Sequence, residues 1–161
     1  MKETTDKAVS KSGKYSVTQL KEMIIDIQND CKLGIKNFVM CNNIIGFGQY
    51  VPSRNNRVSK NKEIKFYYEP ENLFTNRLNS LYHVWFTQDM IIMDDRGNVL
   101  LEKLEALQFN YQTQSPVMDI FGTNSIELGE EVNPGNYKFK IVVHDKLGEE
   151  SVTAIFDFKI V

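Results

Sequence analysis

The sequence lacks the features that mark nucleic-acid-binding and membrane-spanning proteins. Its 19 Lys and Arg nearly balance its 21 Asp and Glu, so the net charge of −2 gives no general attraction to nucleic acid or to an anionic membrane. No apolar run approaches the roughly 20 residues that a transmembrane helix needs. Residues 1–14 are polar, unlike a signal peptide, and we expect them to be disordered. A cytoplasmic location follows, unless the chain is a piece of a longer exported protein.

Cysteine is also scarce. The two cysteines, Cys31 and Cys41, are ten positions apart, and no CxxC motif is present. The disulfide typical of antibody domains needs a cysteine on the penultimate strand, where this chain has none. We therefore expect free apolar thiols, with a disulfide or a metal pair as the alternative.

Alanine is rare, with three residues, and this scarcity favours strands over helices. The clearest strands lie within the last 29 residues, Asn133 to Val161, where apolar residues alternate with polar ones around a charged turn. The pattern predicts an antiparallel hairpin whose buried face carries Tyr137, Phe139, Ile141, Val143, Ala154, Phe156, Phe158 and Ile160. Tyr137 directly follows a Pro-Gly-Asn turn, where immunoglobulin-like sandwiches often keep a corner tyrosine bonded to the preceding backbone.

One segment has helical spacing instead. Ser16 and Gln19 form a capping-box pattern, which predicts a helix that runs to about Asp30. Its apolar residues make a single stripe: Val17, Leu20, Met23, Ile24 and Ile27. The stripe either covers the protein's own core or is a docking face for another chain or for further helices.

Two strand regions precede the middle of the chain. The stretch from Ile35 to Pro52 predicts a first strand that is broken or bulged at Gly46 and Gly48. In the next strand, one buried and one solvated face are expected, because Ile64, Phe66 and Tyr68 alternate with Lys65, Tyr67 and Glu69.

The most apolar strand region runs from Ser80 to Met93, and Val99–Tyr111 returns as its hairpin partner. Val84 and Phe86 point to one side and Trp85 to the other, so both sides of this strand need covering. We expect the helical stripe to lie across the Trp85 side, because the chain offers one unassigned apolar stripe and one uncovered apolar face. An exposed Trp85 would instead mark a binding surface.

Few residues suggest chemistry. His83 and His144 are the only histidines, and on adjacent strands, with a carboxylate nearby, they would suit zinc or copper. Two acidic turns, 94–97 and 145–150, carry carboxylates of the kind that bind calcium. The strands beside these turns are expected to be antiparallel neighbours, which places the turns at opposite ends of the domain. Ordinary hairpin turns and chance histidines are the favoured interpretation, so we expect no metal and no cofactor.

Catalysis is not indicated. No Ser/His/Asp or Cys/His arrangement can be located from spacing, no G-x-S-x-G motif is present, and paired carboxylates occur only in turns. The candidate binding residues are therefore Trp85, His83, His144 and Tyr67.

Several pieces of the chain, read together, resemble a known family. They are Lys36–Cys41, Gly46–Pro52, Glu63–Glu69 with Glu71-Asn72, and Pro134–Tyr137, with Asp94, Gly97 and Asp145 continuing the pattern. In this order they resemble the C-terminal domain of a family of uncharacterised, planctomycete-type bacterial proteins, over roughly residues 35–161. The resemblance implies a β-sandwich preceded by helical sequence, and it implies no activity. The chain departs from the family at Lys60-Asn61, where Pro-Gly is usual.

The sequence therefore predicts an all-β protein. The expected fold is one immunoglobulin-like antiparallel sandwich of about seven or eight strands over residues 35–161, with an amphipathic helix over residues 15–31 packed on it. The expected function is a non-catalytic binding or protein-interaction module that uses the helix or the Trp85 sheet face. The alternative is a protein that binds a metal or small ligand through the strand histidines or the acidic turns. Nucleic acid and membrane insertion are not expected, and the oligomeric state is left open.

Overall fold

The structure is a computed structural model that describes residues 13–60 and 62–161. Within these residues the chain forms one helix and ten strands. In chain order they are α1 (Val17–Asp30), β1 (Gly34–Gly46), β2 (Gln49–Pro52), β3 (Arg57–Val58), β4 (Glu63–Glu71), β5 (Asn76–Leu78), β6 (Leu81–Asp94), β7 (Val99–Thr113), β8 (Gly122–Glu127), β9 (Gly135–Asp145) and β10 (Glu150–Ile160). The predicted disordered tail falls mostly on residues 1–12, which lie outside the described residues, as does Asn61.

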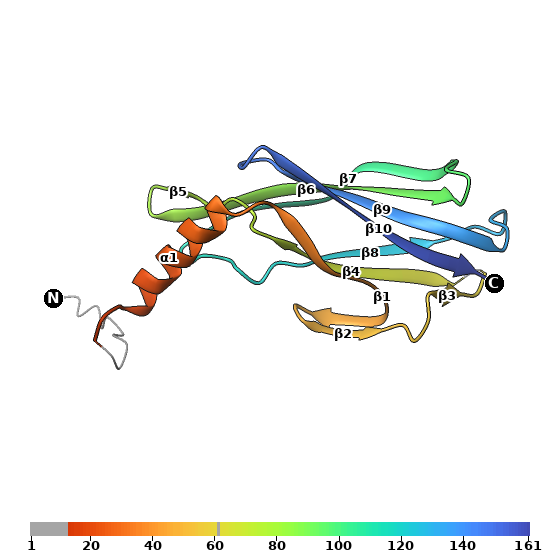
Figure 1. Cartoon of the computed structure of the whole chain (residues 1–161), viewed down its shortest axis with the longest axis horizontal. Helices are drawn as coiled ribbons and strands as arrows, with labels where there is room; N and C mark the ends of the chain where they lie inside the picture. The colour runs from red at the N-terminus through yellow and green to blue at the C-terminus, as the bar shows by residue number, and fades with distance from the viewer. Residues whose placement is uncertain (1–12, 61) are drawn as a thin grey trace.

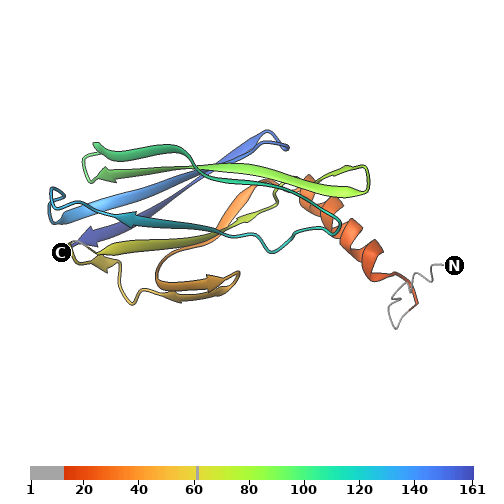
Figure 2. The same ribbon diagram turned by 180° about the vertical axis from the view of Figure 1, so that it is seen from behind.

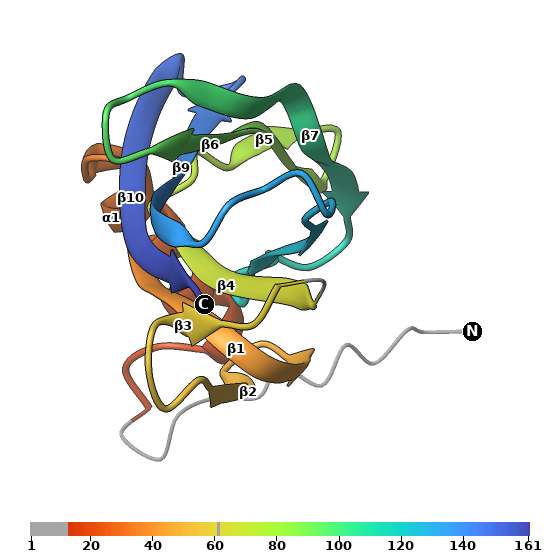
Figure 3. The same cartoon turned by 90° about the vertical axis from the view of Figure 1, so that its right-hand side faces the viewer.

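The strands form two packed sheets (Figure 1). The four-stranded sheet has the order β2-β1-β4-β8, and the six-stranded sheet has the order β3-β10-β9-β6-β5, with β7 paired to β6. Viewed end-on in Figure 3, the six-stranded sheet curls around the core as a half-barrel. The prediction of an all-β fold with one helix is confirmed. The strand count exceeds the expected seven or eight because β2, β3 and β5 are short elements of four, two and three residues.

The two predicted hairpins are confirmed. In the closing hairpin Phe139 of β9 lies opposite Phe156 of β10, with an unbroken register along both strands. The Tyr137 hydroxyl donates to the Asn133 carbonyl at 2.6 Å, as expected of a corner tyrosine. Strands β6 and β9 are antiparallel neighbours, since Phe86 pairs with Asp145 and Asp94 pairs with Tyr137. The two acidic turns therefore lie at opposite ends of the sheet, as predicted.

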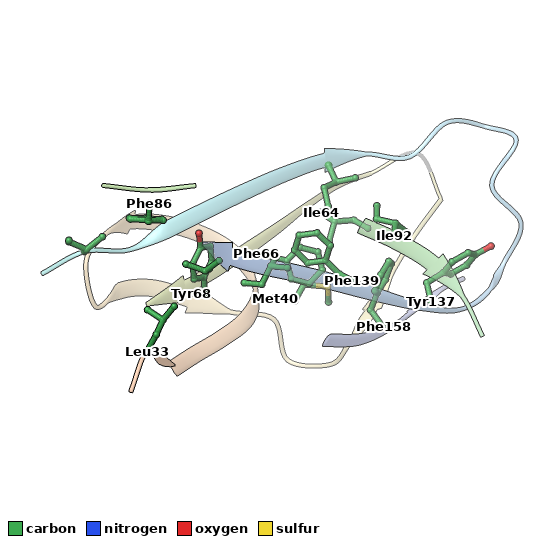
Figure 4. Close-up of a cluster of buried hydrophobic side chains, with 14 of the residues drawn as sticks. Leu33, Met40, Ile64, Phe66, Tyr68, Phe86, Ile92, Tyr137, Phe139 and Phe158 are labelled. Carbon is green, nitrogen blue, oxygen red and sulfur yellow. The ribbon is translucent and has the colours of Figure 1, made fainter. Parts of the chain in front are cut away.

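The core fills the space between the sheets (Figure 4). Phe66 of β4 is fully buried, and its ring centroid lies 4.3 Å from that of Phe139 and 5.5 Å from that of Phe156. Both hairpin strands therefore contribute the inward side chains that alternation predicted.

Strands β1 and β2 correct the prediction of a single broken strand. They form an antiparallel hairpin, with Gly46 opposite Gln49. Gly48 has a φ of +64° in the connecting turn, a conformation that glycine adopts at little cost. The glycines therefore reverse the chain rather than interrupt one strand.

The second face of β4 also differs from the prediction of a solvated face. Tyr67 is fully buried, because its ring stacks on Tyr50 of β2 at 4.2 Å and on Phe121 at 5.5 Å. Glu69 is also buried. Side chains of β2 and of the residue before β8 thus cover this part of the outer face of the four-stranded sheet.

The helix forms where it was predicted, and Ser16 and Gln19 make both bonds of the capping box. Its position does not match the prediction, because the apolar stripe does not cover the Trp85 face. Instead α1 lies against β5 at one end of the sandwich (Figure 1), and its stripe faces solvent. In the described part of the chain, no helix is long and apolar enough to cross a bilayer.

Strand β7 lies at the free edge of the six-stranded sheet (Figure 2). It is 15 residues long and mostly exposed. Its register against β6 shifts between Gln88 and Met90, and Glu105 has a φ of +47° beside this shift. The edge is therefore bent in its middle.

Both cysteines are free, as expected. Cys31 is exposed at the end of α1, whereas Cys41 is buried in β1. Burial raises the pKa of the Cys41 thiol, so this side chain behaves as a small apolar group rather than as a thiolate.

Candidate functional site

The outer face of the six-stranded sheet carries three of the four predicted binding residues. Along β6, Trp85, Thr87 and Asp89 share this face because side chains alternate along a strand. His144 of β9 pairs with Thr87, and Ser151 of β10 pairs with His144. The register therefore places side chains from three strands side by side.

His144 is held by polar partners on both sides. Its Nε2 lies 2.7 Å from Asp89 Oδ2, and its Nδ1 lies 2.8 Å from Ser151 Oγ. The Asp89 Oδ1 atom accepts a hydrogen bond of 2.8 Å from the backbone N–H of Glu105. The imidazole orientation is thus fixed by two strands that flank β9.

A cavity of about 440 Å³ opens beside this array. Thr87, Asp89 and His144 line it from the sheet, and the other lining residues are Leu104, Glu105 and Lys146. Lys146 Nζ lies 3.2 Å from Glu105 Oε1, so this ion pair closes one side. We call this cavity the His144 pocket.

Ser151, His144 and Asp89 have the composition of a hydrolase triad, which sequence spacing did not reveal. The three residues come from β10, β9 and β6, so only the strand register brings them together. However, Ser151 is exposed and does not line the pocket. Because a nucleophile must face the site that holds the substrate, this arrangement gives no support for hydrolysis.

The Asp89 carboxylate should make stability depend on pH. Burial alone would raise its pKa, but the Glu105 amide, His144 and Lys146 together hold the pKa of Asp89 below its usual value. A lowered pKa means that folding favours the carboxylate. Its contribution is complete above the ordinary Asp pKa of about 3.9 and is lost as the pH falls through the folded value.

We therefore expect Asp89→Asn to lower the free energy of unfolding by about 1.5–3 kcal/mol near pH 7, the range for hydrogen bonds to a charged group. Urea denaturation of both proteins near pH 7 and at a pH below the lowered pKa of folded Asp89 would measure this difference. The difference should shrink at the lower pH, because the Asp89 carboxylate of the folded wild type is then protonated as well. A difference of constant size at both pH values would contradict the prediction.

The two histidines do not form one site. His83 and Thr87 are four residues apart on β6, and His144 lies opposite Thr87, so the histidines are separated by about 13 Å along the sheet. His83 Nε2 instead contacts Asn110 Oδ1 at 2.8 Å. Among residues 13–60 and 62–161, no group of three or more His, Cys, Asp or Glu residues has a metal-binding arrangement.

The acidic turns use their carboxylates to hold their own backbone. Asp94 accepts hydrogen bonds from the backbone N–H groups of Arg96 and Asn98, and the Asn98 side chain and these amides lower the pKa of Asp94. Asp145 is buried and accepts from the N–H groups of Leu147 and Gly148. These contacts are those of tight hairpin turns.

Trp85 is partly buried on the outer face, and the exposed apolar stripe of α1 does not cover it. Its backbone carbonyl accepts a hydrogen bond of 2.9 Å from the Lys146 N–H, which ties β6 to the β9–β10 turn. Its indole Nε1 is buried and has no hydrogen-bond partner among the described residues. Trp85 therefore adjoins the His144 pocket without lining it.

Tyr67, the fourth candidate, belongs to a separate and fully satisfied network. Its hydroxyl donates to Glu69 Oε1 at 2.6 Å and accepts from the Gly48 N–H at 2.8 Å. Asn37 donates to the other Glu69 oxygen at 3.0 Å. Burial, with the Glu69 hydrogen bond, raises the pKa of Tyr67 to about 12. These contacts fasten the β1–β2 hairpin to β4, which is a structural role.

The exposed stripe of α1 is a second candidate surface. Its five side chains, Val17, Leu20, Met23, Ile24 and Ile27, are 40–62% exposed. The opposite side of the helix docks on the sandwich, where Ile25 is 1% exposed and Asn29 exchanges two hydrogen bonds with the Thr75 backbone. Arg77 adds ion pairs to Glu22 at 2.6 Å and to Asp26 at 2.9 Å. Periodicity predicted the stripe but not this polar docking.

The chain matches no family model, and no curated protein matches it. An alkylpurine DNA glycosylase from Pseudomonas fluorescens, solved with DNA containing an abasic site analog, is similar at 9% identity and a TM-score of 0.43, over 89% of this chain and 35% of that one. A family 123 glycoside hydrolase from Clostridium perfringens is similar at 12% identity and a TM-score of 0.45, over 81% of this chain and 27% of that one. A β-glucosidase from Listeria innocua is similar at 11% identity and a TM-score of 0.37, over 80% of this chain and 16% of that one.

This chain thus spans 35% or less of each of these proteins. Likenesses this weak carry no information about what the chain binds or does.

Proposed function

We propose that this chain is a non-catalytic interaction module with an immunoglobulin-like sandwich, and that it associates with a second copy of itself through the apolar stripe of α1. The strand order supports the fold assignment. Strands β1, β4 and β8 follow the order of strands A, B and E, and β6, β9 and β10 follow C, F and G. Strand β7 departs from the constant-type order because it pairs with β6 instead of β8. The corner tyrosine Tyr137 agrees with the assignment.

The exposed stripe is the observation that carries the proposed function. Amphipathic helices on globular domains normally turn the apolar side toward the core. In α1 the side that docks on the sandwich is polar apart from Ile25, and the apolar side faces solvent. Contiguous exposed apolar surface of this kind is typical of interaction sites.

The polar docking also holds the helix in place before any partner binds. Glu22, Asp26 and Asn29 bond to Arg77 and Thr75, so contacts from the middle of the helix to its last turn fix its direction. A prearranged surface loses less conformational entropy on binding than a flexible one.

The chemistry of the partner follows from the spacing of the stripe. Val17, Leu20, Ile24 and Ile27 are separated by three, four and three positions, which is the a, d, a, d pattern of a helix-pairing seam. The a positions are the β-branched Val17 and Ile24, and the d positions are Leu20 and Ile27. Of these, β-branched a positions with Leu20 at d favour two-stranded pairing. A partner helix with the same pattern fits this seam, and a second copy of the chain supplies one.

The size of the contact predicts a reversible complex. The helix has 14 residues and is about 21 Å long, so pairing two such helices buries less than the roughly 1,200 Å² at the lower limit of stable interfaces. We therefore expect monomer and dimer to exchange, with the dimer favoured at high protein concentration.

Sedimentation velocity over a range of concentrations tests this proposal. The wild-type sedimentation coefficient should rise with concentration, and Ile24→Glu should keep the protein monomeric, because a carboxylate would be buried in the seam. Ile155→Glu is the matched control. Ile155 is 53% exposed on β10, so this variant should associate like the wild type.

Two results would overturn the proposal. One is a wild-type protein that stays monomeric at every concentration. The other is a dimer that forms equally well with Ile24→Glu, because its interface would then lie elsewhere.

A further inference from the structure

A larger cavity lies at the other end of the outer sheet face, where β3 joins β10 (Figure 1). It has a volume of about 550 Å³, within the range of about 300–1,000 Å³ found for small-ligand sites. Its charged lining residues are Arg57, Asp95, Lys138, Asp157 and Lys159. We call this cavity the Arg57 pocket, and it shares no lining residue with the His144 pocket.

Two positive side chains on neighbouring strands of this pocket have no carboxylate partner. Arg57 of β3 lies opposite Lys159 of β10, and paired strands are only about 4.8 Å apart. Both side chains point away from the core, because the next pair, Val58 and Ile160, packs into it. Among the described residues, neither Arg57 nor Lys159 makes an ion pair. Like charges at such positions repel each other and destabilise the pairing.

The other charged residues leave this excess of positive charge in place. Lys138 and Asp157 form an ion pair of 2.5 Å and so neutralise each other. Asp95 is the remaining carboxylate, set against Arg57 and Lys159, so the lining carries three positive side chains and two negative ones. This net positive charge favours an anion, which would also relieve the repulsion between Arg57 and Lys159.

The backbone around the pocket is held in place by hydrogen bonds. The Lys159 N–H donates to the Asn56 carbonyl at 2.7 Å, so the segment before β3 is fastened to β10. Asn55 Oδ1 accepts from the Arg57 N–H at 3.2 Å, which leaves the side-chain NH2 group of Asn55 as a donor. Asn136 adds a second side-chain amide to the lining. A guanidinium, an ammonium and two amides can therefore donate to one anionic group.

We infer that the Arg57 pocket binds an anion of the phosphate-monoester class, with the phosphate oxygens bonded to Arg57 and Lys159. A guanidinium binds two oxygens of a phosphate at once, and an ammonium adds a point charge. A phosphate monoester carries about −1.5 to −2 charges at neutral pH, so it satisfies two cations better than a carboxylate does. The cavity leaves room for the organic group of the ester, and Tyr137 and Phe158 also line it. This site is independent of the proposed pairing of α1.

Titrations followed by amide NMR spectra of the whole chain, in a buffer without phosphate, test the inference. Four probes carry the same ring and differ in charge: phenyl phosphate, benzoate, phenol and benzylamine. Phenyl phosphate should shift the amide signals of Arg57, Asn136 and Lys159, and it should bind most tightly, followed by benzoate. Inorganic phosphate should shift the same signals and bind more weakly, because it has no ring to occupy the rest of the cavity.

Four variants separate the site from a general effect of charge. Arg57→Gln and Lys159→Gln should each weaken binding of phenyl phosphate roughly tenfold or more, the loss expected for one hydrogen bond to a charged group. Lys103→Gln is the matched control, because it removes the same charge from an exposed position on β7 outside the pocket, and it should leave the affinity nearly unchanged. Asp95→Asn should strengthen binding, because it removes a carboxylate that repels the anion.

Melting curves without phosphate check that the variants fold. Arg57→Gln should melt at the wild-type temperature or above it, because the substitution removes a repulsion between like charges. Several results would overturn the inference: no response to either phosphate probe, tighter binding of phenol or benzylamine than of phenyl phosphate, and equal affinity of Arg57→Gln and wild type. A clearly lower melting temperature for Arg57→Gln would show that this charge already has a partner within the protein, and this would also overturn it.

Discussion

Replacement of Gly122 by alanine is expected to lower the free energy of unfolding by about 3 kcal/mol, the upper part of the range for overpacking a core. Gly122 of β8 lies opposite Tyr68 of β4, and the tyrosine ring lies over the glycine. A Cβ atom at position 122 would be 2.2 Å from both Cε1 and Cζ of this ring. Tyr68 is fully buried in the core cluster, so its ring has no free space to enter.

Urea denaturation of Gly122→Ala and wild type would measure this loss. Gly46→Ala is the control, because a Cβ there would meet no atom within 4 Å. The control should change stability by about 0.5 kcal/mol or less. A loss of similar size in both variants would contradict the argument, since the Tyr68 ring would then not be the cause.

Replacement of Phe66 by alanine should be the most damaging single change in the core. Phe66 is fully buried, and its ring is within 6.0 Å of the ring centroids of Phe38, Phe139, Phe156 and Phe158. Removing such a ring costs about 3–5 kcal/mol through lost burial and the cavity that remains. The free energy of unfolding of a domain is only about 5–15 kcal/mol, so this change would remove a large part of it.

The same denaturation measurement separates this effect from a general effect of aromatic substitution. Phe47→Ala removes an identical ring from the β1–β2 turn, where the side chain is 37% exposed, and it should cost far less. Equal losses at the two positions would mean that Phe66 is not the centre of the core.

The strands that sequence alone predicted well are those with one buried and one solvated face. In β9 and β10 the alternation of apolar and polar residues identified Phe139, Phe156 and the other inward side chains, and a register shift would have exposed them all. The pairing of β6 with β9 was also predicted, and with it the separation of the acidic turns.

Features that depend on contacts between separate segments of the chain were not predictable in this way. Tyr67 and Glu69 have the pattern of a solvated face, and only the folded β1–β2 hairpin buries them. For α1, periodicity identified an apolar side and implied that it faces the core. The helix instead docks through hydrogen bonds and ion pairs from Asn29 and Glu22, which leave no periodic signal in the sequence.

The candidate site was found only in part. His144 and Trp85 were selected as single residues, but Asp89 and Ser151 were not, because each is an ordinary polar residue until the register of three strands is known. Thr87 was missed for a further reason. It lies on the outer face of the sheet by alternation, yet it is 1% exposed, and no local pattern in the sequence reports that burial.

The bend in β7 has a consequence for solubility. An edge strand of 15 residues offers a long row of unpaired backbone groups, and such rows can recruit further strands and grow into fibrils. Here the Glu105 N–H turns toward Asp89, and charged Glu102, Lys103 and Glu105 lie along the bend. A strand from another molecule would therefore find the backbone of β7 bent and flanked by charged side chains, which disfavours pairing. The carboxylate that holds His144 thus also helps to keep the sheet from growing.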